Sequence, residues 1–180
     1  MKVIGLMGRI GSGKGTVADV LINEFGFQSV TMGDLVREEV AVRGLEPTRE
    51  ITTRVSGECL SQDPAYFIKR AVEKINSSGH DRWIIDGVRR PLDVQEFKSA
   101  FPDIIFIRVD VDPRIRFERM KLRGRPGFPE TFEKFQAHES LEDQEFDLNE
   151  TLSHADHVLN NDGTMDELRV KSRELVESLL

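Results

Sequence analysis

The sequence predicts an α/β protein in which helices cover both faces of a parallel β-sheet. Short apolar runs, each about as long as a buried strand, alternate along the chain with longer segments of helical periodicity. This alternation is the order that builds a three-layer αβα fold with the sheet in the middle. Because the 180 residues show no internal repeat and no linker, we expect a single domain over residues 1–180.

Five apolar runs are the expected strands. They cover residues 3–7, 27–32, 83–85, 104–107 and 158–159. The second run is less apolar than the others, and the fourth is bounded by Pro102 and Asp110. The spacing of apolar residues and the capping residues then predict the helices. These cover residues 17–25, 34–43, 47–57, 64–75, 91–97, 113–123 and 165–179.

Two helix ends have clear signals. Thr164 and Glu167 form a capping box at the start of the last helix. Residues 124–129 contain two glycines and two prolines, which end the basic helix before them. The acidic stretch that follows is interpreted as a solvated helix face. Its residues are Glu139, Glu142, Asp143, Glu145 and Asp147.

The charge balance excludes some partners. Lys and Arg number 25 against 32 Asp and Glu, so the net charge of -7 argues against nonspecific binding to nucleic acid. A locally basic segment, residues 108–125, suits a small anion better than a long one. We therefore expect a small-molecule partner and no nucleic acid, with the protein a monomer or a small homo-oligomer.

No apolar run suits a membrane. None approaches the roughly 18 residues of a membrane span. The first run is also shorter than the roughly 7–15 apolar residues of a secretory signal. Cys59 is the single cysteine, which agrees with a reducing compartment. These observations predict a cytoplasmic protein with no membrane partner.

Residues 8–16, GRIGSGKGT, place four glycines, a lysine and a threonine directly after the first expected strand. A strand, a glycine loop and a helix in this order aim several backbone N–H groups at one point, where an anion can bind. The spacing Gly8-x-x-x-x-Gly13-Lys14 is the pattern of a phosphate-binding loop, although Gly15 stands where the pattern has Ser or Thr. The expected ATP-binding residues are Gly8, Gly11, Ser12, Gly13, Lys14, Gly15 and Thr16.

Charged residues after the third expected strand predict the other half of the site. Asp86 lies at the carboxyl end of that strand, where open parallel sheets bind ligands. Its carboxylate can hold Mg²⁺ there, directly or through water, together with Thr16. Arg89 and Arg90 follow at once, and with Arg37 from a facing helix they can grip a phosphate group.

Several segments resemble the adenylate kinase group of nucleoside monophosphate kinases. The loop shares their Gly-Lys-Gly-Thr order, and "TMGDLVREEV" at residues 31–40 resembles their "STGDxLR" element, with Asp34 and Arg37 on matching positions. "IIDGVRRPLD" at residues 84–93 resembles their "DGFPR" element, which puts Arg90 at the arginine for the acceptor phosphate. The loop is also similar to that of dephospho-coenzyme A kinases and deoxynucleoside monophosphate kinases.

This resemblance implies a P-loop kinase fold with a five-stranded sheet in the order 2-3-1-4-5, ATP and Mg²⁺ as cofactors, acceptor-binding helices at about residues 33–78 and a short lid at about residues 124–130. In "ERMKLRGR", Arg119 and Arg123 match the arginine pair before the lid and would bind the donor. The implied catalytic residues are Lys14, Asp34, Arg119 and Arg123.

One departure bears on the lid. The next arginine after Arg125 is Arg169, so the second pair of lid arginines found in many adenylate kinases is missing. Arg116 falls on the same helix face as Arg119 and Arg123, and this face is a candidate clamp for the donor phosphates.

The acceptor is open between two chemical classes. A phosphate acceptor is already anionic and mainly needs cations, whereas an alcohol must lose a proton to a base. Three arginines favour phosphorylation of a nucleoside or deoxynucleoside monophosphate. Asp34 keeps dephospho-coenzyme A kinase as an alternative, with this carboxylate as the base. A third hypothesis is an ATPase switch or assembly factor without a small acceptor.

Overall fold

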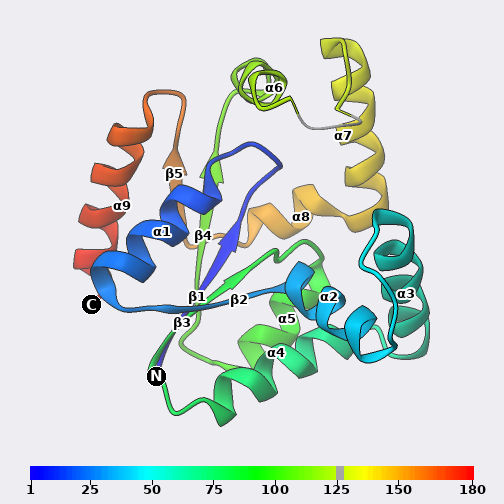
Figure 1. Ribbon diagram of the computed structural model, residues 1–180. Coiled ribbons are helices and arrows are strands. Elements are labelled where there is room, and N and C mark those ends of the chain that lie inside the picture. The colour runs from blue at the N-terminus through cyan, green and yellow to red at the C-terminus, as the bar shows by residue number, and fades with distance from the viewer. Residues whose placement is uncertain (125–127) are drawn as a thin grey trace.

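The computed structural model describes residues 1–124 and 128–180. Its five-stranded sheet is parallel throughout and has the strand order β2-β3-β1-β4-β5, so the predicted fold and strand order are confirmed (Figure 1). The strands are β1 (Lys2–Met7), β2 (Gln28–Thr31), β3 (Arg82–Asp86), β4 (Ile105–Asp110) and β5 (His157–Asn160). Because β1 lies between β3 and β4, the glycine loop leaves the sheet at the middle of its carboxyl edge.

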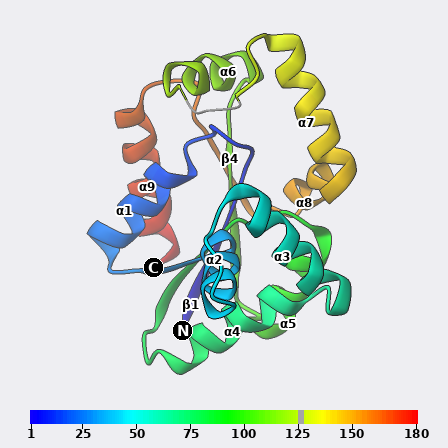
Figure 2. The ribbon, with the colours of Figure 1, turned by 45° about the vertical axis from the view of Figure 1, so that its right-hand side comes forward.

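Helices cover both faces of this sheet. They are α1 (Lys14–Phe25), α2 (Met32–Val42), α3 (Arg49–Gln62), α4 (Tyr66–Ser77), α5 (Pro91–Ala100), α6 (Pro113–Leu122), α7 (Phe132–Phe146), α8 (Leu148–Ser153) and α9 (Met165–Leu179). One core cluster joins α1 and α9 to the sheet, and a second joins α2, α3, α4, α5 and α8 to the opposite face. Figures 1 and 2 both show α6 above the loop that joins β1 to α1, while α7 runs down on the right toward α8.

The predicted elements are present with small shifts at their ends. The capping box of Thr164 and Glu167 begins α9 as expected. Gly57 lies inside α3 and not at its end, because Thr48 caps this helix by accepting from the Ile51 N–H and the helix continues to Gln62. A Cβ at Gly57 would meet no atom within 4 Å, so nothing at this position blocks the helix.

Two further segments concern the region after α6. The short helix α8 was not predicted; it follows Asp147, whose positive φ of 49° turns the chain out of α7. Residues 125–127 of the expected lid lie outside the described residues. Among the residues that are described, no helix has the length and apolar character needed to cross a membrane.

Candidate functional site

The glycine loop between β1 and α1 has a backbone that side chains would disrupt. Gly8, Gly11 and Gly13 all have positive φ angles, of 144°, 80° and 104°. A Cβ at Gly13 would lie 2.4 Å from Asn161 Nδ2, and one at Gly8 would lie 2.6 Å from the Val109 carbonyl oxygen. Both the conformation and the packing therefore require glycine at these positions.

Lys14 stands at the start of α1 with its side chain folded back over the loop. Its ammonium donates to the carbonyl oxygens of Gly8 at 2.7 Å and Arg9 at 3.3 Å. Burial lowers the pKa of Lys14 below its ordinary 10.5, and the nearby Asp86 carboxylate opposes this effect. A buried ammonium held by two carbonyls gains a stronger partner when a phosphate enters the loop.

Asp86 and Thr16 are the residues that fit a magnesium ion. Both line the same cavity, and the Asp86 Oδ1 atom is buried with no hydrogen-bond partner among the described residues. The Thr16 hydroxyl contacts the Met165 sulfur at 3.9 Å, which is a weak acceptor. A carboxylate and a hydroxyl are oxygen ligands of the kind that Mg²⁺ uses beside substrate phosphates, so the residues present fit the ion.

The loop forms one wall of a cavity of about 780 Å³. All of the expected ATP-binding residues line it, and so do Asp86, Arg37, Arg89, Arg90 and Arg123. The remaining lining is largely apolar. It includes Met32, Val36, Leu60, Phe67, Val88 and Phe146. One continuous cavity thus joins the glycine loop to four arginines and a hydrophobic wall.

Arg90 and Arg37 are each held by a carboxylate near this cavity. Arg90 donates from Nε and Nη2 to Oδ1 of the buried Asp93, at 2.9 and 2.7 Å, and Nη2 also reaches the Pro64 carbonyl at 3.0 Å. The other Asp93 oxygen caps α5 by accepting from the Arg90 N–H at 3.0 Å. Arg37 pairs with Asp34, one turn earlier on α2, and both side chains are more than half exposed. Asp93 was not predicted as a site residue, although a carboxylate three residues after Arg90 has the position of a helix-capping residue.

Asp34 is poorly suited to act as a base. Its side chain accepts from the Thr31 hydroxyl and from Arg37, and it is not among the residues that line the cavity. The Thr31 hydroxyl first, and then the Arg37 guanidinium, hold the pKa of Asp34 below its ordinary 3.8. A carboxylate stabilised in its ionised form takes up a proton less readily.

The three arginines expected on one face of α6 have different surroundings. Arg116 is 2% exposed and binds Glu139, so it cannot clamp donor phosphates as expected. Arg119 donates to the carbonyl oxygens of Asn161 at 2.8 Å and Gly163 at 2.6 Å, and so holds the turn before α9. Of the three, Arg123 lines the cavity.

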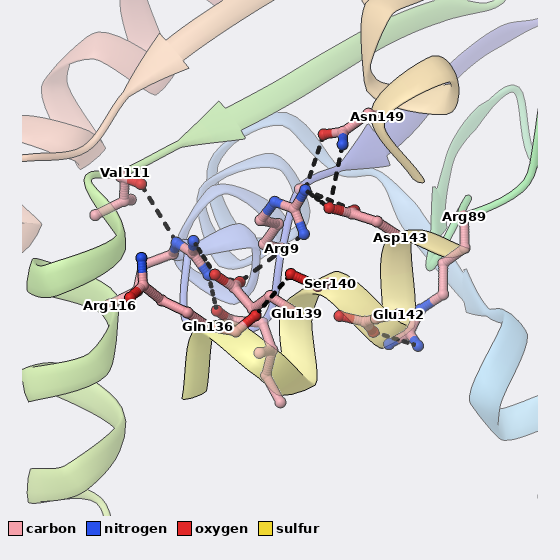
Figure 3. Close-up of polar contacts among 12 residues, drawn as sticks. Arg9, Arg89, Val111, Arg116, Gln136, Glu139, Ser140, Glu142, Asp143 and Asn149 are labelled. Atoms are coloured by element: carbon pink, nitrogen blue, oxygen red, sulfur yellow. Dashed lines mark hydrogen bonds and ion pairs between the residues drawn. The ribbon is translucent and has the colours of Figure 1, made fainter. Parts of the chain in front are cut away.

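The acidic face of α7 is not a solvated surface, and that interpretation was wrong for three of its five residues. Asp143 pairs with Arg9 at 2.6 Å, and Glu142 with Arg89 at 3.3 Å. Glu139 accepts from the buried Arg116, as Figure 3 shows. These carboxylates lie between 12% and 24% exposed because α7 docks against the glycine loop and α6.

The comparisons with known proteins agree with this architecture. Residues 7–136 match the family described as AAA domain. A UPF0200 protein of Thermococcus kodakarensis is 37% identical over 188 residues, which cover 99% of this chain and 98% of that protein. A UPF0200 protein of Thermococcus gammatolerans is 36% identical over 183 residues, covering 99% of this chain and 95% of the relative.

Solved structures show the same fold at low sequence identity. Shikimate kinase from Bacteroides thetaiotaomicron superposes with a TM-score of 0.65 at 15% identity, covering 97% of this chain and 98% of that one. A gluconokinase from Sinorhizobium meliloti gives a TM-score of 0.59 at 16% identity, covering 99% and 95%. The fold is that of P-loop kinases. From the sequence relatives and the matched domain, the chain belongs to the UPF0200 family and carries an AAA domain over residues 7–136.

Proposed function

We propose that this protein is an ATP-dependent phosphotransferase that phosphorylates a nucleoside or deoxynucleoside monophosphate. The observation that carries the proposal is the single cavity that joins the phosphate loop to Arg37, Arg89 and Arg90 beside an apolar wall. Two phosphate-bearing groups fit such a cavity, one at the loop and one at the arginines, and the apolar wall suits a nucleobase. The partner is therefore a small molecule, in agreement with the net charge of -7.

In this reaction the donor's phosphates lie in the glycine loop. The backbone N–H groups at the start of α1 and the Lys14 ammonium bind the β- and γ-phosphates, and Arg123, directly after α6, binds them from the other side of the cavity. Asp86 and Thr16 would hold magnesium, which neutralises charge on the donor phosphates when bound. Desolvation of Lys14 strengthens its interaction with the phosphate charge, because the local dielectric is low.

At the other end of the cavity the arginines orient the acceptor. An oxygen of the acceptor's phosphate attacks the γ-phosphorus, the bond from that phosphorus to the β–γ bridging oxygen breaks, and ADP leaves with the electron pair. The attacking oxygen is already anionic, so no base is required. This agrees with the low pKa of Asp34 and with its place outside the cavity lining.

Dephospho-coenzyme A kinase and an ATPase without a small acceptor are the competing functions. The gluconokinase and the shikimate kinase that share the fold are named after acceptors that bear hydroxyl groups. A hydroxyl acceptor would need a base, and Asp34, next to Arg37 on α2, is the candidate that the resemblance to dephospho-coenzyme A kinases implies.

The test supplies γ-labelled ATP and magnesium with a panel of nucleoside and deoxynucleoside monophosphates, and separately with dephospho-coenzyme A. We expect label in a nucleoside diphosphate, and at least about a hundredfold lower turnover in Lys14→Ala, the scale of losing one preorganised stabiliser. Label in coenzyme A, or phosphate release with no labelled acceptor, would overturn the proposal in favour of the corresponding alternative.

A further inference from the structure

Arg89 combines a fixed backbone with a loosely held side chain. Its N–H donates to Asp93 Oδ2 at 3.0 Å, and its carbonyl oxygen accepts from the buried Thr151 hydroxyl at 2.8 Å. The side chain is 53% exposed, and among the described residues its carboxylate partner is Glu142, through one hydrogen bond of 3.3 Å. The Arg89 backbone is therefore fixed, while its guanidinium can change partners.

The helix that carries Glu142 is anchored by stronger contacts on either side. One turn before, Glu139 pairs with Arg116, which is almost fully buried. Asp143, the residue after Glu142, accepts from Arg9 Nη2 with both carboxylate oxygens, at 2.6 and 2.9 Å. The Asn149 side-chain oxygen accepts from the same nitrogen at 2.9 Å. Figure 3 shows these two anchors beside the single contact of Glu142. Loss of that single contact would leave α7 docked.

We propose that Glu142 is a positioning residue that holds Arg89 in the ligand-free protein and releases it to the phosphate of the acceptor. The proposal rests on the proposed function, because it assigns to Arg89 an incoming phosphate. The carboxylate stands in for that phosphate: it holds the guanidinium of Arg89, a residue that lines the cavity, and the incoming phosphate must displace it.

The balance of interactions favours this exchange. A single contact of 3.3 Å to a half-exposed arginine is a weak ion pair. A phosphate dianion carries more charge than a carboxylate and accepts two parallel hydrogen bonds from a guanidinium. A neutral acceptor offers no such compensation, so Glu142 also disfavours ligands without a phosphate group.

A binding experiment tests the exchange without any turnover. Inorganic phosphate is titrated by calorimetry at low salt into the full chain with Glu142→Gln, Arg89→Ala, both changes, or neither. Glutamine keeps the size of the side chain and removes its charge. Glu145→Gln makes the same charge change on the exposed side of α7 and is the matched control. The Arg89→Ala background reports the phosphate that binds at the glycine loop and at the other arginines, without Arg89.

We expect Glu142→Gln to raise phosphate affinity about twofold to fivefold when Arg89 is present, the range of a half-exposed ion pair. In the Arg89→Ala background the same change should have no effect, and Glu145→Gln should have none in either. An equal gain with and without Arg89 would overturn the inference, because Glu142 would then act only as a general charge beside the loop. No gain at all would also overturn it.

Kinetics separate this inference from the proposed function. If a monophosphate is the acceptor, Glu142→Gln should lower its KM and leave the KM for ATP unchanged. Suppose that the phosphate titrations show coupling between Arg89 and Glu142 but no monophosphate is phosphorylated. That result would refute the proposed function and support the inference about Glu142. Phosphorylation of a monophosphate without that coupling would refute the inference about Glu142 and support the proposed function.

Discussion

Replacing Glu139 by alanine tests whether α7 is held by a buried ion pair. The change leaves the Arg116 guanidinium without its carboxylate in a place where the side chain is 2% exposed. Glu139 accepts from Arg116 with both oxygens, one of them at 3.0 Å from Nη2. Since a guanidinium cannot give up its proton, the variant must bury an unpaired charge or pull the arginine out into water.

The expected loss is about 3 kcal/mol in the free energy of unfolding, the lower end of the range for breaking a buried pair. The lower end applies because Arg116 keeps other partners. The Val111 carbonyl oxygen lies 3.3 Å from its Nε and the Ile10 carbonyl oxygen 3.4 Å from its Nη1, and the Phe135 ring lies 5.4 Å from the guanidinium carbon. A loss of this size corresponds to a fall of roughly 6–12 °C in Tm for a domain of this length.

The assay is urea unfolding followed by the fluorescence of Trp83, the single and buried tryptophan. Glu145→Ala is the control and should stay within about 0.5 kcal/mol of the wild type. Combining Arg116→Met with Glu139→Leu should recover stability to within about 1 kcal/mol, because a buried pair can be replaced by apolar groups. A loss below about 1 kcal/mol in Glu139→Ala, or a double variant as unstable as the single one, would refute the reasoning.

Three further predictions follow from the site. Because burial lowers the pKa of Lys14 below 10.5, the unfolded chain binds its proton more tightly, so stability should rise with pH between the folded pKa and 10.5. Lys14→Met should lack this contribution. The urea midpoints of the wild type and of Lys14→Met, measured across this pH range, should therefore change differently with pH, and identical profiles would contradict the prediction. Gly13→Ala places a Cβ 2.4 Å from Asn161 at a φ of 104°, so we expect roughly 1–3 kcal/mol lower stability and lost ATP binding in calorimetry. Asp93→Ala removes the two hydrogen bonds that fix the Arg90 guanidinium and the carboxylate that caps α5, so it should misplace Arg90 and raise the acceptor KM roughly tenfold in steady-state kinetics. An unchanged KM would count against this role.

The sequence was sufficient to predict the sheet and the glycine loop because their signals are local. A buried strand is a short apolar run, and the loop requires glycines at set offsets whose positive φ angles the structure shows at Gly8, Gly11 and Gly13. The order of the strands came from the resemblance and is confirmed by the pairing of β1 with β3 and β4. Asp86, Arg37, Arg89 and Arg90 lie on one cavity, as expected from the carboxyl ends of the strands.

The partners of the charged helices could not be predicted, because they depend on contacts between distant parts of the chain. Arg9 and Asp143 are 134 residues apart in sequence, and a carboxylate on a helix has the same local pattern whether it faces water or a buried arginine. A signal was present in the aromatic residues around the expected lid. Phe117 on α6 packs against Phe128 and Phe135 with ring centroids 5.7 Å apart in both pairs, which joins α6 to α7. That joining explains why the acidic face of α7 meets the loop.

The acidic helix α7 also bears on how an acidic protein could keep the phosphate site proposed above. Arg9, Lys14, Arg89 and Arg116 gather around one loop, and two like charges about 5 Å apart repel by roughly 3 kcal/mol at an effective dielectric of 20. In the ligand-free protein the carboxylates of α7 and Asp86 offset this repulsion. In the proposed exchange, a phosphate has charge of the same sign as these carboxylates and replaces one of them at Arg89 without leaving cations unpaired. The net charge of -7 argues against a long polyanion as the ligand, while the acidic residues beside the loop stabilise the cations that the proposed function assigns to a small phosphate.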